Sequence, residues 1–176
     1  MKASLVQPTG VERKLLDHEL IVSKSDLHGV ITYVNDVFLR ISGYTEAEVL
    51  GKPHSVLRHP EMPRAVFRLL WKALQEGREC FAYVVNLAKN GDHYWVHAHV
   101  TPTFGAGNKV VGYHSNRRAP SPDAIGRVVP VYRKLCAEED RHGDASSAVK
   151  AGTALLDRTL QSAGMTYDQY VWELTP

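Results

Sequence analysis

The pattern of apolar and polar positions changes its period twice along the chain. Near the N-terminus, two short runs rich in β-branched residues flank a turn at Gly29, which predicts a β-hairpin. The apolar positions then recur at helical spacing as far as Gly77, and beyond it they alternate with a period of two. The five strands that this pattern predicts cover residues 18–25, 30–34, 80–87, 93–104 and 109–117.

Capping residues mark the helices between the two groups of strands. Asn35 precedes an amphipathic stretch that ends at Gly43, and Thr45 with Glu48 has the spacing of a capping box. Pro63 begins a longer amphipathic helix, since proline favours the first helical turn. The expected fold class is therefore α+β, with one five-stranded antiparallel sheet and the helices over one face.

The last third of the chain follows a different pattern. After a break with two prolines, helical segments are predicted at about 123–140, 144–163 and 167–174. The chain is accordingly divided into an N-terminal arm at 1–17, a central domain at 18–118 and a helical extension at 119–176. Apolar residues that could form a homodimer surface are Val128, Val129, Tyr132 and Leu135 in the extension and Leu15 and Leu16 in the arm.

The composition is that of an ordinary globular protein and excludes few functions. Of the 176 residues, 44% are hydrophobic and 23% are charged, with a net charge of +2 and no basic block, so nucleic acid is not an expected partner. No apolar run approaches the roughly 20 residues of a membrane span, and no secretory segment is visible. The expected location is the cytoplasm, where Cys80 and Cys136 would be reduced.

The stretch 51–63 concentrates the candidate chemistry and reads Gly-Lys-Pro-His-Ser-Val-Leu-Arg-His-Pro-Glu-Met-Pro. Its three prolines exclude a continuous helix or a central strand, so its backbone polar groups need other partners. Arg58 can bind a phosphate through two parallel hydrogen bonds, and Glu61 can orient Arg58 or His59. The alternatives are a solvated connector, a surface salt bridge of Arg58, and a helix-terminal acid at Glu61.

Three histidines raise the question of a metal. His93, His97 and His99 share strand parity and would line one face of the sheet. Zinc needs three or four converging ligands and haem a single axial histidine, whereas a solvent-facing or dimer-facing stripe is the more common arrangement. No nucleophile motif and no phosphate-binding glycine motif is present, so the expectation is no metal site and no enzyme.

Six motifs stand out along the central domain. They are Thr-Tyr-Val-Asn-Asp-Val-Phe at 32–38, Ser-Gly-Tyr-Thr at 42–45, Gly-Lys-Pro-His at 51–54, Arg-His-Pro-Glu-Met-Pro at 58–63, Phe67 with Trp71, and Lys-Asn-Gly-Asp-His-Tyr-Trp-Val at 89–96. Together they resemble the FAD-binding PAS domains of the bacterial aerotaxis-receptor family. The resemblance covers about residues 20–118 and implies a PAS fold in which FAD lies non-covalently between the helices and the sheet, with its redox state as the signal.

The same resemblance assigns the candidate cofactor-binding residues. Asparagines at the first helix and on the strand facing the ring would supply donor and acceptor together. The chain departs from the family at Glu61, which replaces an aspartate, and at 79–82, which replaces a Pro-Trp-x-Gly segment. The residues that match the family's positions are Arg58, His59, Glu61, Trp71, Asn35, Asn86 and His54.

The expected function is therefore a sensor of redox, oxygen or energy state that signals through an unidentified protein partner. A haem-binding gas sensor and a small flavoenzyme are the alternatives. Reduction of the flavin is expected to rotate the Asn86 amide so that its donor and acceptor exchange places. The resulting conformational change is expected to be transmitted through the sheet. The expected output surface is the outer sheet face, which carries Trp95 and the histidines.

Overall fold

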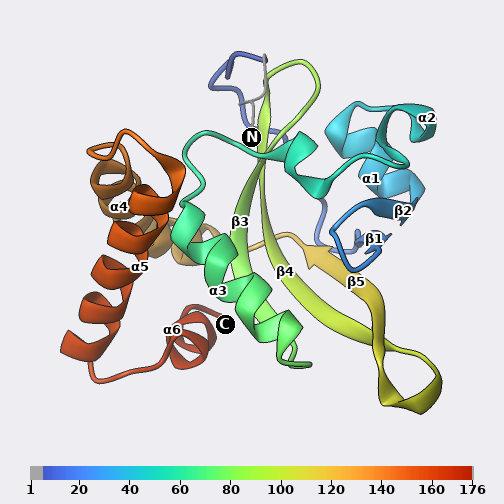
Figure 1. Cartoon of the computed structure of the whole chain (residues 1–176). Helices are drawn as coiled ribbons and strands as arrows, with labels where there is room; N and C mark the ends of the chain where they lie inside the picture. The colour runs from blue at the N-terminus through green and yellow to red at the C-terminus, as the bar shows by residue number, and fades with distance from the viewer. Residues whose placement is uncertain (1–5, 176) are drawn as a thin grey trace.

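One antiparallel sheet organises the fold, with its strands in the order β2-β1-β5-β4-β3 (Figure 1). The structure is a computed structural model and describes residues 6–175. The first and last strands pair with each other inside the sheet, so the two ends of the domain meet at its centre. The strands are β1 (Ile21–Ser25), β2 (Ile31–Val34), β3 (Cys80–Leu87), β4 (His93–Phe104) and β5 (Val110–Arg118). The expected α+β class, with one five-stranded antiparallel sheet and helices over one face, is confirmed.

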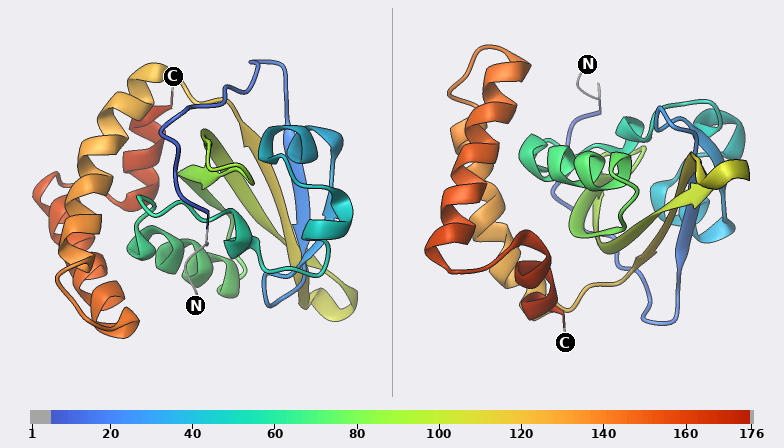
Figure 2. Two further views of the ribbon diagram at one scale, coloured as in Figure 1. Left: turned by 90° about the horizontal axis from the view of Figure 1, so that it is seen from above. Right: turned by 60° about the horizontal axis from the view of Figure 1, so that its bottom comes forward.

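The helices form two groups (Figures 1 and 2). The first group follows β2 and lies over one face of the sheet: α1 (Asp36–Ser42), α2 (Glu46–Val49), the 3₁₀ helix η1 (His54–Leu57) and α3 (Arg64–Gln75). The second group follows β5 and packs at the β3 side: α4 (Pro122–Glu139), α5 (Ala145–Ser162) and α6 (Tyr167–Leu174). A short 3₁₀ turn, η2 (Ala106–Asn108), joins β4 to β5. Within residues 6–175, no helix is long and apolar enough to cross a membrane.

The helix boundaries follow from the capping residues that the sequence predicted. The Asn35 side chain accepts a hydrogen bond from the N–H of Phe38, and Gly43 ends α1 in the left-handed conformation at φ 73°. Glu48 accepts from the N–H of Thr45, which is one half of the predicted capping box. Ser121, which was not among the predicted capping residues, accepts a hydrogen bond from the N–H of Ala124 and begins α4.

Strand register assigns each side chain to one of two sheet faces. We call the face toward α3 the inner face, because Trp71 of α3 meets Tyr113 of β5 at a ring distance of 5.5 Å. The pairs Ala82–Ala98 and Val84–Val96 share this face, and Arg117 stands beside Ala98. The opposite parity defines the outer face, which carries Phe81, Tyr83, Trp95, His97 and His99.

Helices α4 and α6 cover the outer face over β3 and β4. The Tyr132 hydroxyl of α4 donates to the carbonyl of Tyr83 at 2.6 Å, and the Trp172 ring of α6 lies 5.1 Å from Phe81. The rings of Tyr83 and His97 stack at 4.7 Å beneath this cover. The predicted output surface is therefore covered over β3 and β4 by the chain's own helices, so a separate partner would not contact this part of it directly.

The apolar stripe of α4 is also buried within one chain. Val128, Tyr132 and Leu135 are exposed by no more than 4%, and Leu15 of the arm is buried as well. Their apolar surface is already removed from water, so it supplies no driving force for association. The homodimer surface expected on the α4 stripe is therefore wrong for these buried residues. Of the other two residues predicted for it, Val129 is half-buried and Leu16 is 55% exposed.

The N-terminal arm runs beside the turn between β3 and β4. Backbone hydrogen bonds join Thr9 to Gly91 at 2.8 Å and Arg13 to His93 at 2.7 Å. The Arg13 guanidinium also binds the Asp92 carboxylate at 2.9 Å. Residues 1–5 of the predicted arm lie outside the described part of the chain.

Replacing Gly91 by alanine tests whether the arm is docked. Gly91 has a φ of +96°, and a Cβ atom there would lie 2.2 Å from the carbonyl oxygen of Gln7. We expect Gly91→Ala to lower the free energy of unfolding in urea by about 1–3 kcal/mol and to speed proteolysis of the arm.

Gly126→Ala is the matched control for this experiment. Gly126 lies in α4, and apart from the neighbouring backbone of its own helix no described atom lies within 4 Å of the position that a Cβ atom would take there. Alanine at this position should therefore stabilise the helix by up to about 1 kcal/mol. Equal effects of the two substitutions on stability and proteolysis would contradict the docked arm.

Candidate functional site

The loop at 51–63 crosses the full width of the sheet (Figure 1). At its start, Lys52 accepts a hydrogen bond from the N–H of Ile31 on β2 at 2.9 Å. At its end, Arg58 forms an isolated β-bridge with Asn86 on β3. Since β2 and β3 are the two edge strands, one loop pairs with both edges of the sheet. The loop thereby holds Arg58 and His54 against the inner face.

A buried arginine stands at the centre of the inner face. Arg117 on β5 is 8% exposed, and its Nη2 donates to Ser23 Oγ at 3.0 Å. Its Nη1 has no hydrogen-bond partner, and no carboxylate within residues 6–175 forms a salt bridge with it. Burial lowers the pKa of Arg117 to about 10, which leaves the side chain charged at neutral pH. A buried charge without an acidic partner is costly unless a ligand compensates for it.

His54 completes a hydrogen-bonded chain with this arginine. Its Nε2 lies 3.0 Å from Ser23 Oγ and 3.3 Å from Arg117 Nη2. Because the arginine can only donate, Nε2 acts as the acceptor and the ring proton belongs on Nδ1. Burial, together with the charge of Arg117, lowers the pKa of His54 to about 3. His54 is therefore neutral at physiological pH and supports the arginine without adding charge.

Two further polar side chains of the inner face lack partners. The Ser115 hydroxyl, two residues before Arg117, is buried without a hydrogen bond. The Asn86 side chain is 8% exposed, and its amide forms no hydrogen bond within the described part of the chain. We call His54, Asn86, Ser115 and Arg117 the inner-face polar group. Two of the five buried side-chain atoms without a hydrogen bond among residues 6–175, Ser115 Oγ and Arg117 Nη1, lie two residues apart on the inner face. The other three are His97 Nε2 on the outer face and the hydroxyls of Tyr167 and Tyr170 in α6. Buried polar groups are normally paired, so the unpaired atoms of Ser115 and Arg117 indicate a place for a polar ligand.

Small apolar residues form a flat floor beside this polar group. Ala82 lies opposite Ala98, and Val84 lies opposite Val96, on neighbouring strands. None of these four side chains is large, so this part of the sheet surface carries no bulky projection, and the larger Tyr94 stands at its end, opposite Asn86. A flat apolar surface bordered by hydrogen-bonding groups suits a planar heteroaromatic ring.

The loop residues have contrasting environments. The Arg58 guanidinium lies 5.1 Å from the Phe67 ring and makes one long contact, 3.5 Å, with the Met62 carbonyl oxygen. His59 is buried, and its Nδ1 accepts from the backbone N–H of Glu61 at 3.1 Å. Burial lowers the pKa of His59. Glu61 thus orients His59 through its backbone, and its carboxylate forms no hydrogen bond or ion pair among residues 6–175.

Asn35 and Trp71 complete the predicted set. Asn35 Oδ1 accepts from the N–H groups of Val22 and Phe38, and its Nδ2 donates to the Leu20 carbonyl, so the amide mainly joins β1 to α1. Trp71 lies at the β1–β2 side of the inner face. The structure therefore brings His54, Asn86 and Trp71 to the inner face, Arg58 and His59 to its β3 edge, and leaves the side chains of Asn35 and Glu61 in other roles.

Four residues of the site were not predicted from the sequence: Ser23, Tyr94, Ser115 and Arg117. Tyr94 lies opposite Asn86 and is fully buried, and burial raises its pKa. A signal was present, because Tyr113, Ser115 and Arg117 share one face of the predicted strand at 109–117 and two of the three are polar. Polar residues at inward positions are the pattern that indicates a binding site rather than a plain core.

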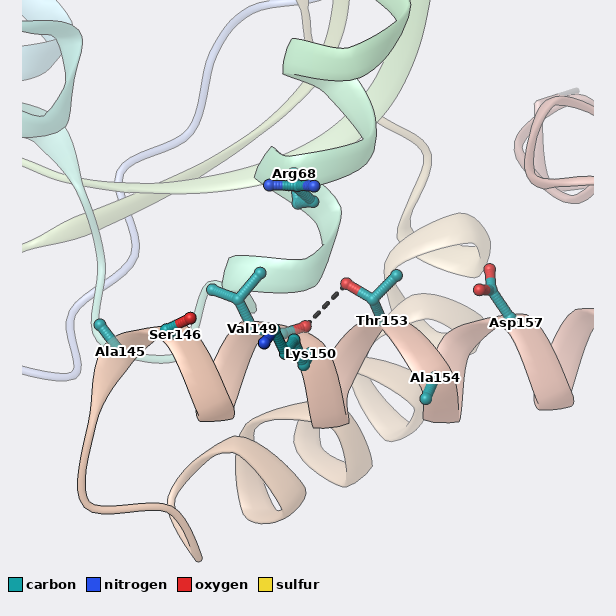
Figure 3. Close-up of a pocket in the computed structure, with 8 residues that line it drawn as sticks. All are labelled: Arg68, Ala145, Ser146, Val149, Lys150, Thr153, Ala154 and Asp157. Carbon is teal, nitrogen blue, oxygen red and sulfur yellow. Dashed lines mark hydrogen bonds between the residues drawn. The ribbon is translucent and has the colours of Figure 1, made fainter.

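A groove of about 580 Å³ lies elsewhere, between α3 and α5. Figure 3 shows Arg68 of α3 facing α5, where the Thr153 hydroxyl bonds to the carbonyl of Val149. The groove includes none of the predicted site residues and no buried unpaired polar atom. Within residues 6–175, no cluster of three or more His, Cys, Asp or Glu side chains could hold a metal ion. The inner face is therefore the candidate site.

Comparison with known proteins agrees with the fold. The sequence model of the PAS fold matches residues 31–117. The aerotaxis receptor of Escherichia coli (strain K12) is 42% identical over 123 residues, which cover 70% of this chain and 24% of the receptor. A nitrogen fixation regulatory protein of Klebsiella pneumoniae is 27% identical over 97 residues, which cover 55% of this chain and 20% of that protein.

Solved structures show the same architecture. A light-oxygen-voltage domain studied with a flavin analogue superposes with a TM-score of 0.58 at 23% identity, covering 66% of this chain and 88% of that one. At this identity the likeness shows the fold alone. The chain spans about a quarter or less of the length of the two curated relatives.

The depressed pKa of His54 predicts a pH dependence of stability. The folded protein protonates His54 only near pH 3, whereas the unfolded chain does so near its ordinary pKa of 6.5. Stability should therefore fall as the pH drops below 6.5, by up to about 1.4 kcal/mol per pH unit from this residue.

Urea unfolding between about pH 6.5 and pH 4.5 measures this slope. His54→Asn should flatten it, whereas His28→Asn, at an exposed turn, should leave it unchanged. The same slope in wild type and His54→Asn would show that His54 is not held neutral by the fold.

Proposed function

This chain contains a PAS domain, and on that premise we propose that it is a cytoplasmic sensor module that binds FAD non-covalently between the inner face and α3. The redox state of the bound FAD would be signalled to another protein through direct contact with this domain. The similarity to an aerotaxis receptor supports a sensory role, and the LOV domain studied with a flavin analogue supports a flavin as the ligand class.

The observation that carries this proposal is the inner-face polar group. A flavin ring has a polar edge with both donors and acceptors, and a flat apolar body. The free Asn86 amide offers both kinds of group, and Arg117 Nη1 and Ser115 Oγ are buried and unpaired. The Ala82–Ala98 and Val84–Val96 pairs would lie under the ring.

The loop at 51–63 supports a dinucleotide rather than a bare ring. Arg58 forms no ion pair among residues 6–175, and its guanidinium is held against Phe67. A guanidinium of this kind binds phosphate with two hydrogen bonds, which suits the pyrophosphate of FAD. The buried His59 fixes the backbone that carries Arg58 through its bond to Glu61.

The flavin would supply the redox chemistry when bound, and the protein would orient it and respond. Arg117 would donate to an oxygen of the ring, supported by Ser23 and His54. Asn86 can rotate its amide and exchange donor for acceptor. A change at β3 would reach α4 through the bond between the Tyr132 hydroxyl and the Tyr83 carbonyl.

The assembly also belongs to the proposal. A homodimer would use a surface other than the α4 stripe, since that stripe is buried within one chain. The downstream partner would contact the outside of α4–α6 or the exposed part of the sheet.

The absorption spectrum of the purified protein tests the cofactor. Bands near roughly 370 and 450 nm indicate flavin and a Soret band near roughly 400 nm indicates haem, since each follows from the cofactor's own electronics. We expect flavin bands, and release of FAD rather than FMN on denaturation. A colourless protein that fails to bind added FAD would refute the proposal, and steady NAD(P)H turnover would favour an enzyme.

Arg58→Ala tests the phosphate contact. Losing a charge-assisted bond of about 1.5–3 kcal/mol should weaken FAD binding by about tenfold or more, while riboflavin, which lacks phosphate, should bind equally to both proteins. Fluorescence titration of the apoprotein measures both affinities.

The matched control is Arg68→Ala, because Arg68 lies on the exposed side of α3. It should bind both ligands like wild type. If Arg58→Ala weakened riboflavin as much as FAD, the assigned phosphate contact would be wrong.

A further inference from the structure

The last residue of α4, Glu139, caps the first turn of α3. Its Oε2 accepts from the N–H of Arg64 and its Oε1 from the N–H of Ala65, each at 2.9 Å. The first N–H groups of an α-helix have no partner within the helix. Pro63 at the N-cap position makes no side-chain capping bond, so Glu139 provides the cap from a distant part of the chain.

The carboxylate is enclosed from behind by α5. Glu139 is 5% exposed, and a Cβ atom at Gly152 would lie 2.5 Å from its Oε1. Only a glycine leaves room for the carboxylate at this point. Helix α5 therefore holds Glu139 against the start of α3, so that α3, α4 and α5 meet at one residue.

The charge of Glu139 acts on the candidate site. It has no salt-bridge partner among residues 6–175, and the positive end of the α3 dipole faces it. Burial lowers the pKa of Arg58, the nearby Arg64 adds to this effect, and Glu139 opposes it. Glu139 and Arg58 thus interact electrostatically as well as through the backbone that joins them.

A second contact of α4 reaches the loop itself. The Cys136 thiol, one turn before Glu139, donates to the carbonyl oxygen of Glu61 at 3.3 Å. The last turn of α4 therefore contacts both the end of the loop and the start of α3. Met62 and Pro63, which lie between these two contacts, are buried.

We propose that Glu139 is a positioning residue of the cofactor site, although it lies outside the matched PAS segment at 31–117. It holds the loop and α3 in the arrangement that presents Arg58, Phe67 and Trp71 to the ligand. This inference rests on the flavin-binding function proposed above. The extension is then part of the site rather than an attachment to it.

Thermodynamic reciprocity gives this proposal a distinctive consequence. If the contact of Glu139 with α3 favours flavin binding, flavin binding must favour that contact by the same factor. Binding of FAD should therefore protect α5 from hydrogen exchange, although α5 contains none of the predicted cofactor-binding residues. Ligand binding also slows exchange that requires global unfolding, so the response that counts is protection of those α5 amides that exchange by local opening in the flavin-free protein.

The experiment compares variants of the full chain after removal of any bound flavin. Glu139→Gln keeps the shape of the side chain but removes its charge and one of its two good acceptors. It should weaken FAD binding about fivefold or more and abolish the FAD-induced protection of α5. Gly152→Ala keeps the charge but displaces the carboxylate, and it should give the same two losses.

The neighbouring Glu138→Gln is the matched control, since among residues 6–175 Glu138 pairs only with Arg141 and His142, in the turn after α4. It should behave like wild type in both measurements. The proposal is overturned if Glu139→Gln and Gly152→Ala keep the FAD-induced protection of α5, whatever their affinity. It is also overturned if wild-type protein binds FAD without protecting α5, whereas failure of wild type to bind FAD at all would overturn the proposed function itself.

Discussion

A positive charge buried at the centre of the sheet is the constraint on which the site depends. Arg117 projects from β5 toward the helices and has Ser23 and His54 as its polar neighbours, with no carboxylate to neutralise it among residues 6–175. Transfer of an unpaired charge out of water costs several kcal/mol unless hydrogen bonds or a charged partner offset the cost. The fold supports the charge with a neutral histidine, since a second cation beside it would raise the cost further. The inner face is therefore arranged for a ligand with acceptor atoms.

The two faces of the sheet are linked by the helical extension. On the outer face, Tyr132 and Trp172 cover β3 and β4, while Glu139 at the end of the same helix α4 caps α3 on the inner side. Helix α4 thus contacts both β3, a strand that forms part of the candidate site, and α3, the helix that lies over the inner face. Any change in the loop or in β3 reaches the same helix, which makes α4 the natural element to carry a signal away from the site.

The boundaries of helices and turns could be predicted because bonds between nearby residues define them. The burial of Arg117 could not be predicted, because it depends on pairing between strands that are distant in sequence. Asn35, Gly43 and the Asn90-Gly91 turn define boundaries through bonds within a few residues, so the sequence contains the whole cause. Arg117 is a different case, because it becomes buried only through the pairing of β5 with β1, ninety or more residues away. An apolar stripe likewise shows that a helix face is buried but not what buries it. The α4 stripe therefore suggested a second chain where the structure places the sheet.

The measurement that tests the buried charge most directly compares Arg117→Met with Arg118→Met, its exposed neighbour on the same strand. Removing an uncompensated buried charge should raise the urea stability of the flavin-free protein, while removing a ligand donor should weaken FAD binding by about tenfold or more. If the charge is kept for the ligand, Arg117→Met should therefore raise the stability of the flavin-free protein and lower its affinity for FAD. Arg118→Met should change neither. Wild-type FAD affinity in Arg117→Met, or a loss of stability without FAD, would contradict the account.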